Sequence, residues 1–279
     1  ARACAATDVT GTPAAREATQ VTDLLFDLDG CLWFGDRLAP GAVEVVAELR
    51  ARGYGTFFLT NASNRTSAQL AQKLRRLGIE AAQEDVLAPL TVLTQHELLG
   101  PDSKVLVLGN PVIAQVLREA GITTVRQGEQ ASVVVVGNSR DLRFGDLIPA
   151  ITALDNGARL LALNLDRRVP TATAVAPGTG AIVSALTTAT GVSPQVLGKP
   201  SRLYFSGALE RFNLNAASTA MIGDSPDTDI AGGNGSGLTT ILVGGATPAG
   251  PDEEPDFRIR ALTDLLDHFP RLAKGVRAV

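Results

Sequence analysis

Short apolar runs alternate with amphipathic stretches along most of the chain from Val21 onward. The apolar runs are rich in Val, Ile, Leu and Phe, which is typical of buried strands. The stretches between them place apolar residues at helical spacing. This alternation predicts an α/β protein built on a mostly parallel, Rossmann-like sheet.

Several amphipathic stretches carry recognisable helix ends. Residues 40–53 predict a helix that stops at Gly53, and Thr66 with Gln69 predicts a capping box at the start of the next one. The residues expected to share one face of the first helix are Val43, Val46, Ala47 and Arg50. Further helices are expected at 112–120, 145–156 and 178–191, the last with Ile182, Leu186 and Ala189 on one side.

The apolar runs end in two different kinds of residue. Runs that end at Asp27, Thr60 and Asp224 finish in chemically active side chains, whereas those at 104–110 and 132–138 finish in Gly–Asn. In open parallel sheets, ligands collect at the carboxyl ends of strands where the strand order reverses. We therefore expect the first and last thirds of the chain to form one domain that carries a site. The expected division is a disordered tail at 1–20, a core domain at 21–100 and 194–279, and an inserted α/β domain at 101–193.

Composition narrows the class of protein. The formal net charge of −4 and the pI of about 5.3 argue against a nucleic-acid-binding protein. No apolar run approaches the length that crosses a bilayer, so no membrane partner is expected. The two cysteines, Cys4 and Cys31, give neither a disulfide framework nor a zinc-binding spacing. These features predict a cytoplasmic protein.

Two groups of aspartates follow apolar runs. Asp27 and Asp29 close the first run, and Asp224, Asp227 and Asp229 lie in GDSPDTD after a later one. Carboxylates this close repel one another, and burying them without a partner is costly. A Mg²⁺ ion, which prefers a few carboxylates plus water and phosphate oxygens, would offset the repulsion. The alternative is that each aspartate forms a turn or caps a helix, as Asp beside Gly, Ser and Pro often does.

Two further polar segments are open to a functional interpretation. Thr60 and Asn61 follow the second apolar run, and Lys199 lies between a glycine and a proline. The lysine is suited to hold a phosphoryl oxygen and to offset the aspartates. Equally, Thr60 and Asn61 are suited to cap a turn, and Lys199 to lie at the surface.

Four segments in this order resemble the motifs of the haloacid dehalogenase (HAD) superfamily: DLDGCLW, LTNAS, GKP and GDSPDTDI. The similarity is closer to HAD phosphatases that carry a large α/β cap between the second and third motifs. That branch includes NagD-like proteins and p-nitrophenyl, phosphoglycolate and pyridoxal phosphate phosphatases. The segment NLDRRVPTATAVAPGTGAIVSAL also resembles this branch, and the likeness extends from Leu24 to Val243.

The resemblance implies Mg²⁺-dependent hydrolysis of small phosphate monoesters through an aspartyl-phosphate. Asp27 would be the nucleophile, and Asp29 the general acid and base, with its backbone carbonyl on the metal. Thr60, the Asn61 backbone and Lys199 would bind the phosphoryl group. Asp224 and Asp229 would complete the metal site, Gly30 would allow the turn, and Asp227 is interpreted as a turn residue. Dimers that form through the cap are common in this branch, so the resemblance is also compatible with a homodimer.

Four polar residues of the inserted domain are further candidates for the site. Asn138 and Arg140 are expected to reach the far end of the substrate, although an exposed loop arginine is the plain alternative. Asn164 and Asp166 are expected near the hinge and the substrate, beside a glycine-rich helix start at Gly178–Gly180 that suits an anion.

Other functions have weaker support. A phosphomutase or phosphotransferase would use the same scaffold, and a non-catalytic phosphate-binding module would retain ligand without turnover. A dehalogenase would need neither Asp29 nor the metal cluster. GTGAIV at Gly178 lacks the third glycine of the dinucleotide fingerprint, which disfavours a nucleotide-dependent oxidoreductase.

The remaining reactive residues do not suggest another mechanism. His96 and His268 lie in predicted helices outside any constellation, so a serine or cysteine hydrolase lacks its usual base. Cys31 is expected to be a packed small residue rather than a nucleophile. The glycine-rich segment 231–237 predicts a soft helix with rapid amide exchange, because each interior glycine costs about 0.5–1 kcal/mol relative to alanine.

Overall fold

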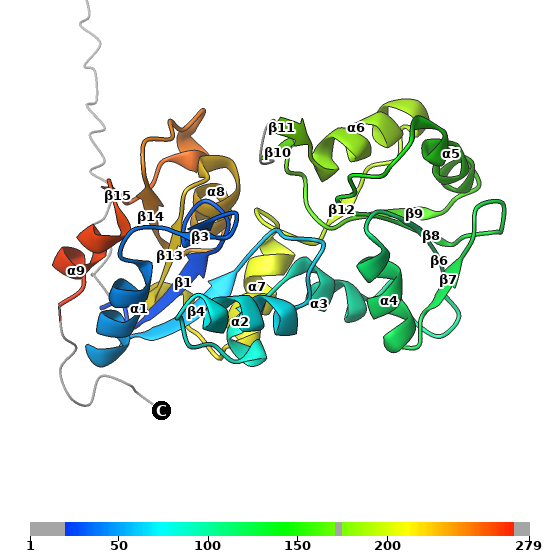
Figure 1. The fold of residues 1–279 in the computed structure, drawn as a ribbon. Coiled ribbons are helices and arrows are strands. Elements are labelled where there is room, and N and C mark those ends of the chain that lie inside the picture. Colours follow the sequence, from blue (N-terminus) through cyan, green and yellow to red (C-terminus); the bar gives the residue numbers. More distant parts are fainter. Residues whose placement is uncertain (1–19, 171–174, 271–279) are drawn as a thin grey trace, which may run out of the picture.

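A computed structural model of the chain describes residues 20–170 and 175–270. The apolar runs form two parallel sheets, which Figure 1 shows beside one another. The first has six strands in the order β15-β14-β13-β1-β4-β5, and every pairing is parallel. These strands are β1 (Asp23–Asp27), β4 (Gly55–Leu59), β5 (Val86–Leu87), β13 (Thr219–Gly223), β14 (Thr239–Val243) and β15 (Phe257–Ile259).

Strand β1 is the point at which the order of the first sheet reverses. Its side chains alternate between two apolar layers: Leu24 and Phe26 face one, and Leu25 faces the other. The layer with Leu24 and Phe26 includes α1 (Ala42–Ala51), α2 (Ser67–Arg76) and α9 (Leu265–His268). The layer with Leu25 includes α7 (Arg202–Arg211). Because β1 is covered on both faces, its central residues Leu24, Leu25 and Phe26 are all apolar and buried.

The second sheet has five parallel strands in the order β12-β9-β8-β6-β7. They are β6 (Lys104–Leu108), β7 (Thr123–Val125), β8 (Val133–Val136), β9 (Arg159–Ala162) and β12 (Gln195–Val196). Helices α3 (Pro89–Thr94) and α4 (Pro111–Glu119) cover one face, and α5 (Leu147–Asp155) and α6 (Thr179–Thr190) the other. The expected fold class, with a mostly parallel Rossmann-like sheet and a second α/β layer, is confirmed.

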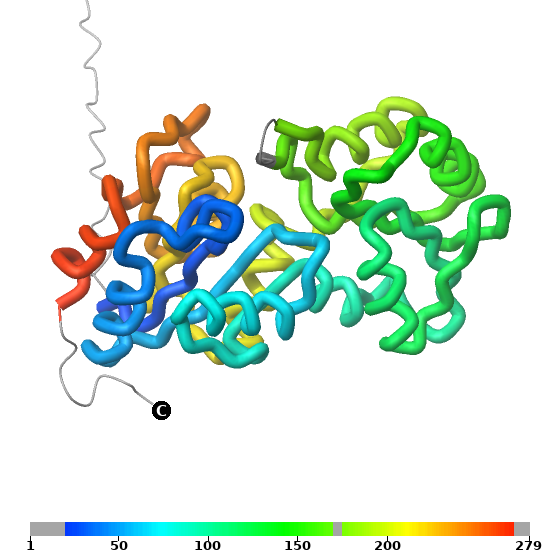
Figure 2. Tube along the Cα trace, in the orientation of Figure 1, coloured from blue at the N-terminus to red at the C-terminus, as the bar shows by residue number. Residues whose placement is uncertain are grey.

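The second sheet extends beyond the predicted range 101–193. Strand β12 pairs with β9, so the sheet continues to Val196. Leu90 and Leu93 of α3 also pack in the hydrophobic core of the second sheet. Figure 2 shows the chain passing from the first sheet to the second after α3 and returning before α7.

Two predicted helix faces are corrected. The buried residues of α1 are Ala42, Val45, Val46 and Leu49, whereas Ala47 is exposed. In α6 Val183 and Leu186 are buried, and Ala189 is exposed. The capping box of Thr66 and Gln69 is confirmed. His96 follows α3 rather than lying within a helix.

The remaining elements are short. Two antiparallel hairpins are formed by β2 (Trp33–Phe34) with β3 (Arg37–Leu38), and by β10 (Arg168–Pro170) with β11 (Val175–Pro177). A π-helical turn, Pro226–Ile230, leads into α8 (Ala231–Gly235). One-turn 3₁₀ helices occur at Gln83–Asp85, Phe144–Asp146, Ala216–Ser218, Pro251–Glu253 and Leu262–Asp264.

Some expectations lie outside the described residues. The predicted disordered tail falls almost wholly on residues 1–19, which are not described. Among residues 20–170 and 175–270, none of the helices combines the length and the apolar character needed to pass through a bilayer.

Candidate active site

Three carboxylates meet at the carboxyl edge of the first sheet. Asp27 ends β1, Asp224 directly follows β13, and Asp229 lies in the π-helical turn behind it. One carboxylate oxygen from each residue lies within 4.8 Å of those of the other two. Asp27 and Asp229 are buried, and Asp224 is partly exposed. Because β1 and β13 are adjacent and parallel, their ends coincide, and this brings together residues almost two hundred positions apart.

Lys199 is the cation of this cluster. Its ammonium Nζ donates to Asp229 Oδ1 at 2.6 Å and, at closer range, to Asp27 Oδ1. The lysine is 2% exposed, which excludes the surface interpretation. Burial acts to lower the pKa of the Lys199 ammonium, but Asp229 and Asp27 outweigh it and raise that pKa well above its ordinary value. Lys199 therefore stays protonated.

A single lysine does not balance three carboxylates. Burial raises the pKa of Asp27 well above its ordinary value although Lys199 opposes the shift, and Asp229 and Asp224 raise it further. Burial and the neighbouring Asp229 raise the pKa of Asp224 to about 6. Both shifts mean that the protein alone stabilises the full set of negative charges poorly.

The donor set fits a hard divalent cation. Mg²⁺ binds through one or two carboxylates plus water and phosphate oxygens, and oxygen is the only donor element that these three aspartates offer. A dication would also lower the raised pKa values of Asp27 and Asp224 by direct attraction. The aspartates were the predicted metal ligands, and the structure brings three of the four side chains together.

Two glycines leave space for these carboxylates. A Cβ at Gly30 would lie 2.3 Å from Asp224 Oδ2, and Gly30 has a φ of +99°, which side-chain-bearing residues rarely adopt. A Cβ at Gly223 would lie 2.2 Å from Asp229 Oδ2. The backbone of the site is therefore specific for glycine at both positions.

The Asp29 side chain lies outside the carboxylate cluster. It is exposed, and its Oδ1 accepts a 2.8 Å hydrogen bond from Trp33 Nε1. Its Oδ2 lies 3.5 Å from Thr60 Oγ1, at the outer limit of a hydrogen bond. Asp29 is therefore close to Thr60 without joining the cluster of Asp27, Asp224 and Asp229, which suits a group that must exchange protons.

Thr60 is held by a residue that the sequence did not single out. Tyr204 is fully buried, and its phenolic oxygen lies 2.8 Å from the Thr60 carbonyl oxygen and 2.6 Å from that of Leu87. The same oxygen accepts from the Thr60 backbone N–H at 3.2 Å. Burial raises the pKa of Tyr204, so the phenol stays neutral. No local pattern marks Tyr204, because its partners are far away in the sequence.

Asn61, which follows β4 of the first sheet, is hydrogen-bonded both to Lys199 and to residues that follow β9 of the second sheet. Its Oδ1 accepts from the Lys199 backbone N–H at 2.8 Å, and its Nδ2 donates to the Asp166 carboxylate at 2.8 Å. Buried Asn164 donates through its amide to the Asn61 carbonyl oxygen at 2.6 Å. Burial raises the pKa of Asp166, and the bond from Asn61 opposes the shift. Asn164 and Asp166 were predicted to lie near the hinge and the substrate. The structure shows that both side chains are hydrogen-bonded to Asn61.

The other predicted residues of the second sheet lie near its strand ends. The Asn138 backbone N–H donates to Ser63 Oγ at 3.0 Å, which links the loop after β8 to the first sheet. Arg140 is exposed on the same loop. A substrate contact for either residue stays a prediction.

The two glycines at the start of α6 already use their N–H groups within the protein. The Gly178 N–H donates to the Arg167 carbonyl, and the Gly180 N–H donates to the Asp166 carbonyl. A Cβ at either glycine would also lie within about 2.3 Å of that neighbouring segment. These glycines therefore allow close packing of two backbone segments, and an anion site at this helix start stays a prediction.

Two residues have the non-catalytic places expected of them. Cys31 is buried, and burial raises its pKa well above its ordinary value, so the thiol is neutral. Asp227 is exposed and accepts a hydrogen bond from Ser225 Oγ at 2.7 Å, outside the carboxylate cluster.

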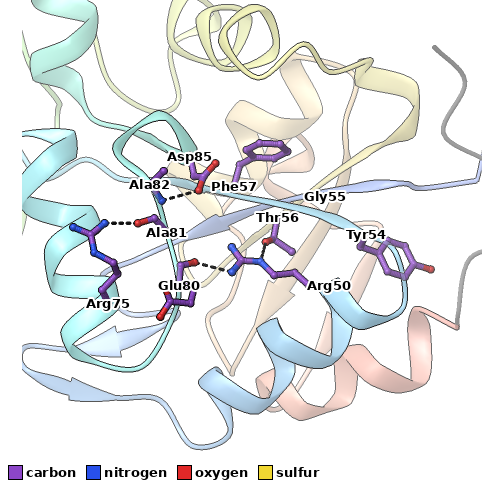
Figure 3. Close-up of a pocket in the computed structure, with 10 residues that line it drawn as sticks. All are labelled: Arg50, Tyr54, Gly55, Thr56, Phe57, Arg75, Glu80, Ala81, Ala82 and Asp85. Carbon is purple, nitrogen blue, oxygen red and sulfur yellow. Dashed lines mark hydrogen bonds between the residues drawn. The ribbon is translucent and has the colours of Figure 1, made fainter.

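A separate hollow of about 700 Å³ lies at the opposite edge of the first sheet (Figure 3). Gly55, the first residue of β4, lines it, whereas Thr60 follows the far end of that strand. Its two arginines donate to carbonyl oxygens of its own wall, Arg50 to Glu80 and Arg75 to Ala81. This hollow is not part of the candidate active site.

Comparison with known proteins supports a common family. Residues 24–123 match the model of the haloacid dehalogenase-like hydrolases, and residues 196–267 match a second, HAD-hydrolase-like model. The 5'-nucleotidase YutF of Bacillus subtilis is 35% identical over 251 residues, which cover 88% of this chain and 97% of that protein. The acid sugar phosphatase of Staphylococcus aureus is 34% identical over 220 residues, 78% of this chain and 85% of that protein.

Solved structures of phosphatases share the whole architecture. The p-nitrophenyl phosphatase from Archaeoglobus fulgidus superimposes with a TM-score of 0.80 at 31% identity, covering 90% of this chain and 100% of that one. A glycerol phosphate phosphatase from Mycobacterium tuberculosis in complex with magnesium gives a TM-score of 0.77 at 32% identity, covering 88% and 77%. Taken with the aspartate cluster and its lysine, these matches show that the chain belongs to the haloacid dehalogenase-like hydrolases, as a phosphatase of their NagD-like branch.

Proposed function

We propose that this phosphatase hydrolyses small phosphate monoesters with the help of Mg²⁺ and through an aspartyl-phosphate on Asp27. The observation that carries the proposal is the buried ion pair of Asp27 with Lys199, beside two further carboxylates. A carboxylate attacks an anionic phosphoryl group only when cations screen the charge. This arrangement supplies one cation directly and the ligands for a second.

In the first step, an Asp27 carboxylate oxygen forms a bond to phosphorus in line with the ester oxygen. The phosphorus–ester oxygen bond breaks as Asp29 gives its proton to that oxygen, and the alcohol leaves. Lys199 and the hydroxyl of Thr60 bind the phosphoryl oxygens, together with the backbone N–H of Asn61. Asp27, Asp224 and Asp229, with the Asp29 carbonyl, are the groups that would hold Mg²⁺, which supplies charge neutralisation.

In the second step, Asp29 accepts a proton from water as the water oxygen bonds to phosphorus. The bond from phosphorus to the Asp27 oxygen breaks, which regenerates the carboxylate and releases phosphate. Asp29 must therefore be protonated in one step and ionised in the next. Its exposed position beside Thr60 suits both states.

The inserted α/β layer is proposed to select the substrate. Relatives named for 5'-nucleotides and sugar phosphates are similar in sequence to this chain, and a glycerol phosphate phosphatase is similar in structure, so these classes form the natural test panel. Asn138 and Arg140, which lie after β8, are proposed to contact the part of the substrate remote from phosphorus.

The test is phosphate release from a 5'-nucleotide, a sugar phosphate, glycerol phosphate and p-nitrophenyl phosphate, with and without Mg²⁺. The wild type is compared with Asp27→Asn, and with Asp102→Asn as a matched change at an exposed position. We expect Mg²⁺-dependent turnover that falls by roughly three orders of magnitude or more in Asp27→Asn alone. Turnover that survives Asp27→Asn contradicts the nucleophile assignment, and a folded wild type inactive on every ester contradicts the function.

A further inference from the structure

The β2–β3 hairpin is tied to helix α2 by one buried lysine. Lys73 of α2 is 4% exposed, and its Nζ donates to the Gly35 carbonyl at the hairpin turn at 2.6 Å. The same ammonium lies 4.1 Å from the centroid of the Trp33 ring and 3.7 Å from Asp36 Oδ1. An ammonium on the face of an indole is attracted to it, and the attraction grows when both groups are withdrawn from water. Lys73 therefore holds both the hairpin turn and the ring of Trp33.

Trp33 connects this contact to Asp29. Its side chain is fully buried, and its indole N–H donates to Asp29 Oδ1 at 2.8 Å. The backbone repeats the link, since the Gly30 N–H donates to the Trp33 carbonyl oxygen at 2.8 Å. If the Asp29 carboxylate rotated away, it would leave a buried donor without that partner, and burying an unpaired donor is costly. The indole therefore restricts the orientation of an otherwise exposed carboxylate.

We propose that Trp33 is a positioning residue that aims the Asp29 carboxylate at the leaving oxygen, and that Lys73 fixes Trp33 for this task. The inference rests on the proposed role of Asp29 as general acid. With Oδ1 held by the indole, Oδ2 is the oxygen that lies beside the Thr60 hydroxyl, one of the proposed phosphoryl-binding groups. The bond thus selects which oxygen carries the transferred proton.

The proposal has a signature that a purely structural role lacks. Protonation by Asp29 matters most when the leaving group is a strongly basic alkoxide, and least when it is the stable p-nitrophenolate. The ratio kcat/KM reports only steps up to the first irreversible one, here phosphoryl transfer to Asp27. A misaimed Asp29 should therefore lower kcat/KM for alkyl esters selectively.

The first experiment compares Trp33→Phe with wild type in saturating Mg²⁺, using glycerol phosphate and p-nitrophenyl phosphate. Phenylalanine keeps an aromatic ring beneath Lys73 but removes the N–H donor. We expect kcat/KM to fall about tenfold for glycerol phosphate, as loss of one hydrogen bond to a charged group allows, and less than twofold for p-nitrophenyl phosphate. Tyr54→Phe is the matched control, because it removes an aromatic donor that bonds the Pro270 carbonyl.

A second variant keeps the indole in place. Lys73→Met preserves the length of the stem and removes the charge, and Lys104→Met makes the same change at an exposed position. We expect Lys73→Met to lower kcat/KM for glycerol phosphate about threefold, again more than for p-nitrophenyl phosphate, and Lys104→Met to leave both unchanged.

The protein also contains its own probe, because Trp33 is its one tryptophan. Tryptophan emission should shift in Lys73→Met and in Asp29→Ala, each of which removes a neighbour of the indole, and should not shift in Lys104→Met. An unchanged emission in Asp29→Ala overturns the contact in solution.

The kinetic results separate this inference from the proposed function. If Trp33→Phe and Lys73→Met lower kcat/KM equally for both esters, or not at all, while Asp27→Asn remains inactive, the positioning role is wrong and the function stands. If the wild type hydrolyses neither ester, the failure is that of the proposed function. Circular dichroism establishes that each variant is folded at the assay temperature.

Discussion

The two sheets have the same construction but opposite chemistry at their strand ends. Strands of the first sheet end in Asp27, Thr60 and Asp224, whereas β6, β8 and β9 of the second are followed by asparagines, namely Asn110, Asn138 and Asn164. The amide side chain of Asn110 caps α4, and that of Asn164 binds Asn61. Amides satisfy backbone groups and carry no charge, so they need no counterion.

This difference shows how one architecture supports two tasks. The edge of the first sheet concentrates negative charge where a phosphoryl group and a cation can use it, at a cost in charge repulsion. The edge of the second forms joints, through Asn164 to Asn61 and through Asn138 to Ser63. In both sheets the side chains that follow the strands meet at the carboxyl edge. The types of these residues determine whether the edge forms a charged site or a structural contact.

The largest expected effect comes from removing the Lys199 ammonium from the carboxyl edge of the first sheet. Lys199→Met leaves buried Asp27 and Asp229 without their counterion, and breaking a buried pair in this way destabilises a protein by about 3–5 kcal/mol. Urea unfolding of the metal-free protein measures the loss, and activity should be abolished. Lys104→Met, at the start of β6 in the second sheet, should change the free energy of unfolding by less than about 0.5 kcal/mol. Equal stability of the two variants would contradict the comparison.

A smaller effect concerns pH. The pKa of Asp224 is raised to about 6 in the folded protein, above the ordinary value of 3.8. Between about pH 4 and pH 6 the unfolded chain has lost this proton while the folded state retains it, so stability falls as pH rises through that window. The free energy of unfolding of the metal-free wild type should therefore decline relative to Asp224→Asn across this range.

Mg²⁺ should act in the opposite direction. It binds ionised carboxylates in the folded state, so at a pH above 6 it should raise the midpoint temperature of thermal unfolding. At pH 5, where Asp224 is protonated, the increase should be smaller. Thermal unfolding with and without Mg²⁺ checks this, with Asp224→Asn as the variant that should respond weakly. A wild type whose response to Mg²⁺ is the same at pH 5 and pH 7 would count against the assigned ligand.

The smallest effect distinguishes two asparagines of the second sheet. Asn164→Ala removes two side-chain hydrogen bonds, one to the Asn61 carbonyl and one from the Asp166 N–H, and should cost about 1–2 kcal/mol of stability. Asn110→Ala removes the helix-capping bond from the Val112 N–H and should cost about 1 kcal/mol. Only Asn164 is bonded to Asn61, so only Asn164→Ala should lower kcat/KM for phosphate release. Loss of activity in Asn110→Ala at matched stability would show that the joint is not specific to Asn164.

The sequence was informative where one local pattern determines the outcome. Continuous apolar runs predicted parallel strands, because strands covered on both faces have no polar side. Asp27 and Asp224 were expected at one edge because parallel strands end there, and the structure places them together. The family resemblance implied that Lys199 and Asp229 join them, and both side chains lie in the cluster. The prediction of the buried face of α1 was wrong at Ala47. This residue directly follows buried Val46, and one step along a helix is enough to turn a side chain toward solvent.

The sequence was uninformative where partners lie far apart along the chain. Tyr204 meets Thr60 across 144 positions, and Asn61 meets Lys199 across 138, so no local spacing reveals either contact. The glycines of α8 were interpreted only as a source of softness. A Cβ at Gly232 would lie 2.1 Å from the Phe205 ring, so this glycine permits close packing of α8 on α7. Rapid amide exchange in segment 231–237 stays a prediction.

The position of Lys199 constrains how this protein can evolve. The lysine lies three residues after Val196, the last residue of the second sheet, and its backbone is fastened to Asn61. A recombination event that exchanged the whole inserted layer for another would enter the chain at this short return segment. We expect the length between β12 and Lys199 to be restricted, because this segment connects the second sheet to the ammonium that pairs with Asp27. The segment that returns from the second sheet therefore also sets the position of the cation in the first sheet's carboxylate cluster.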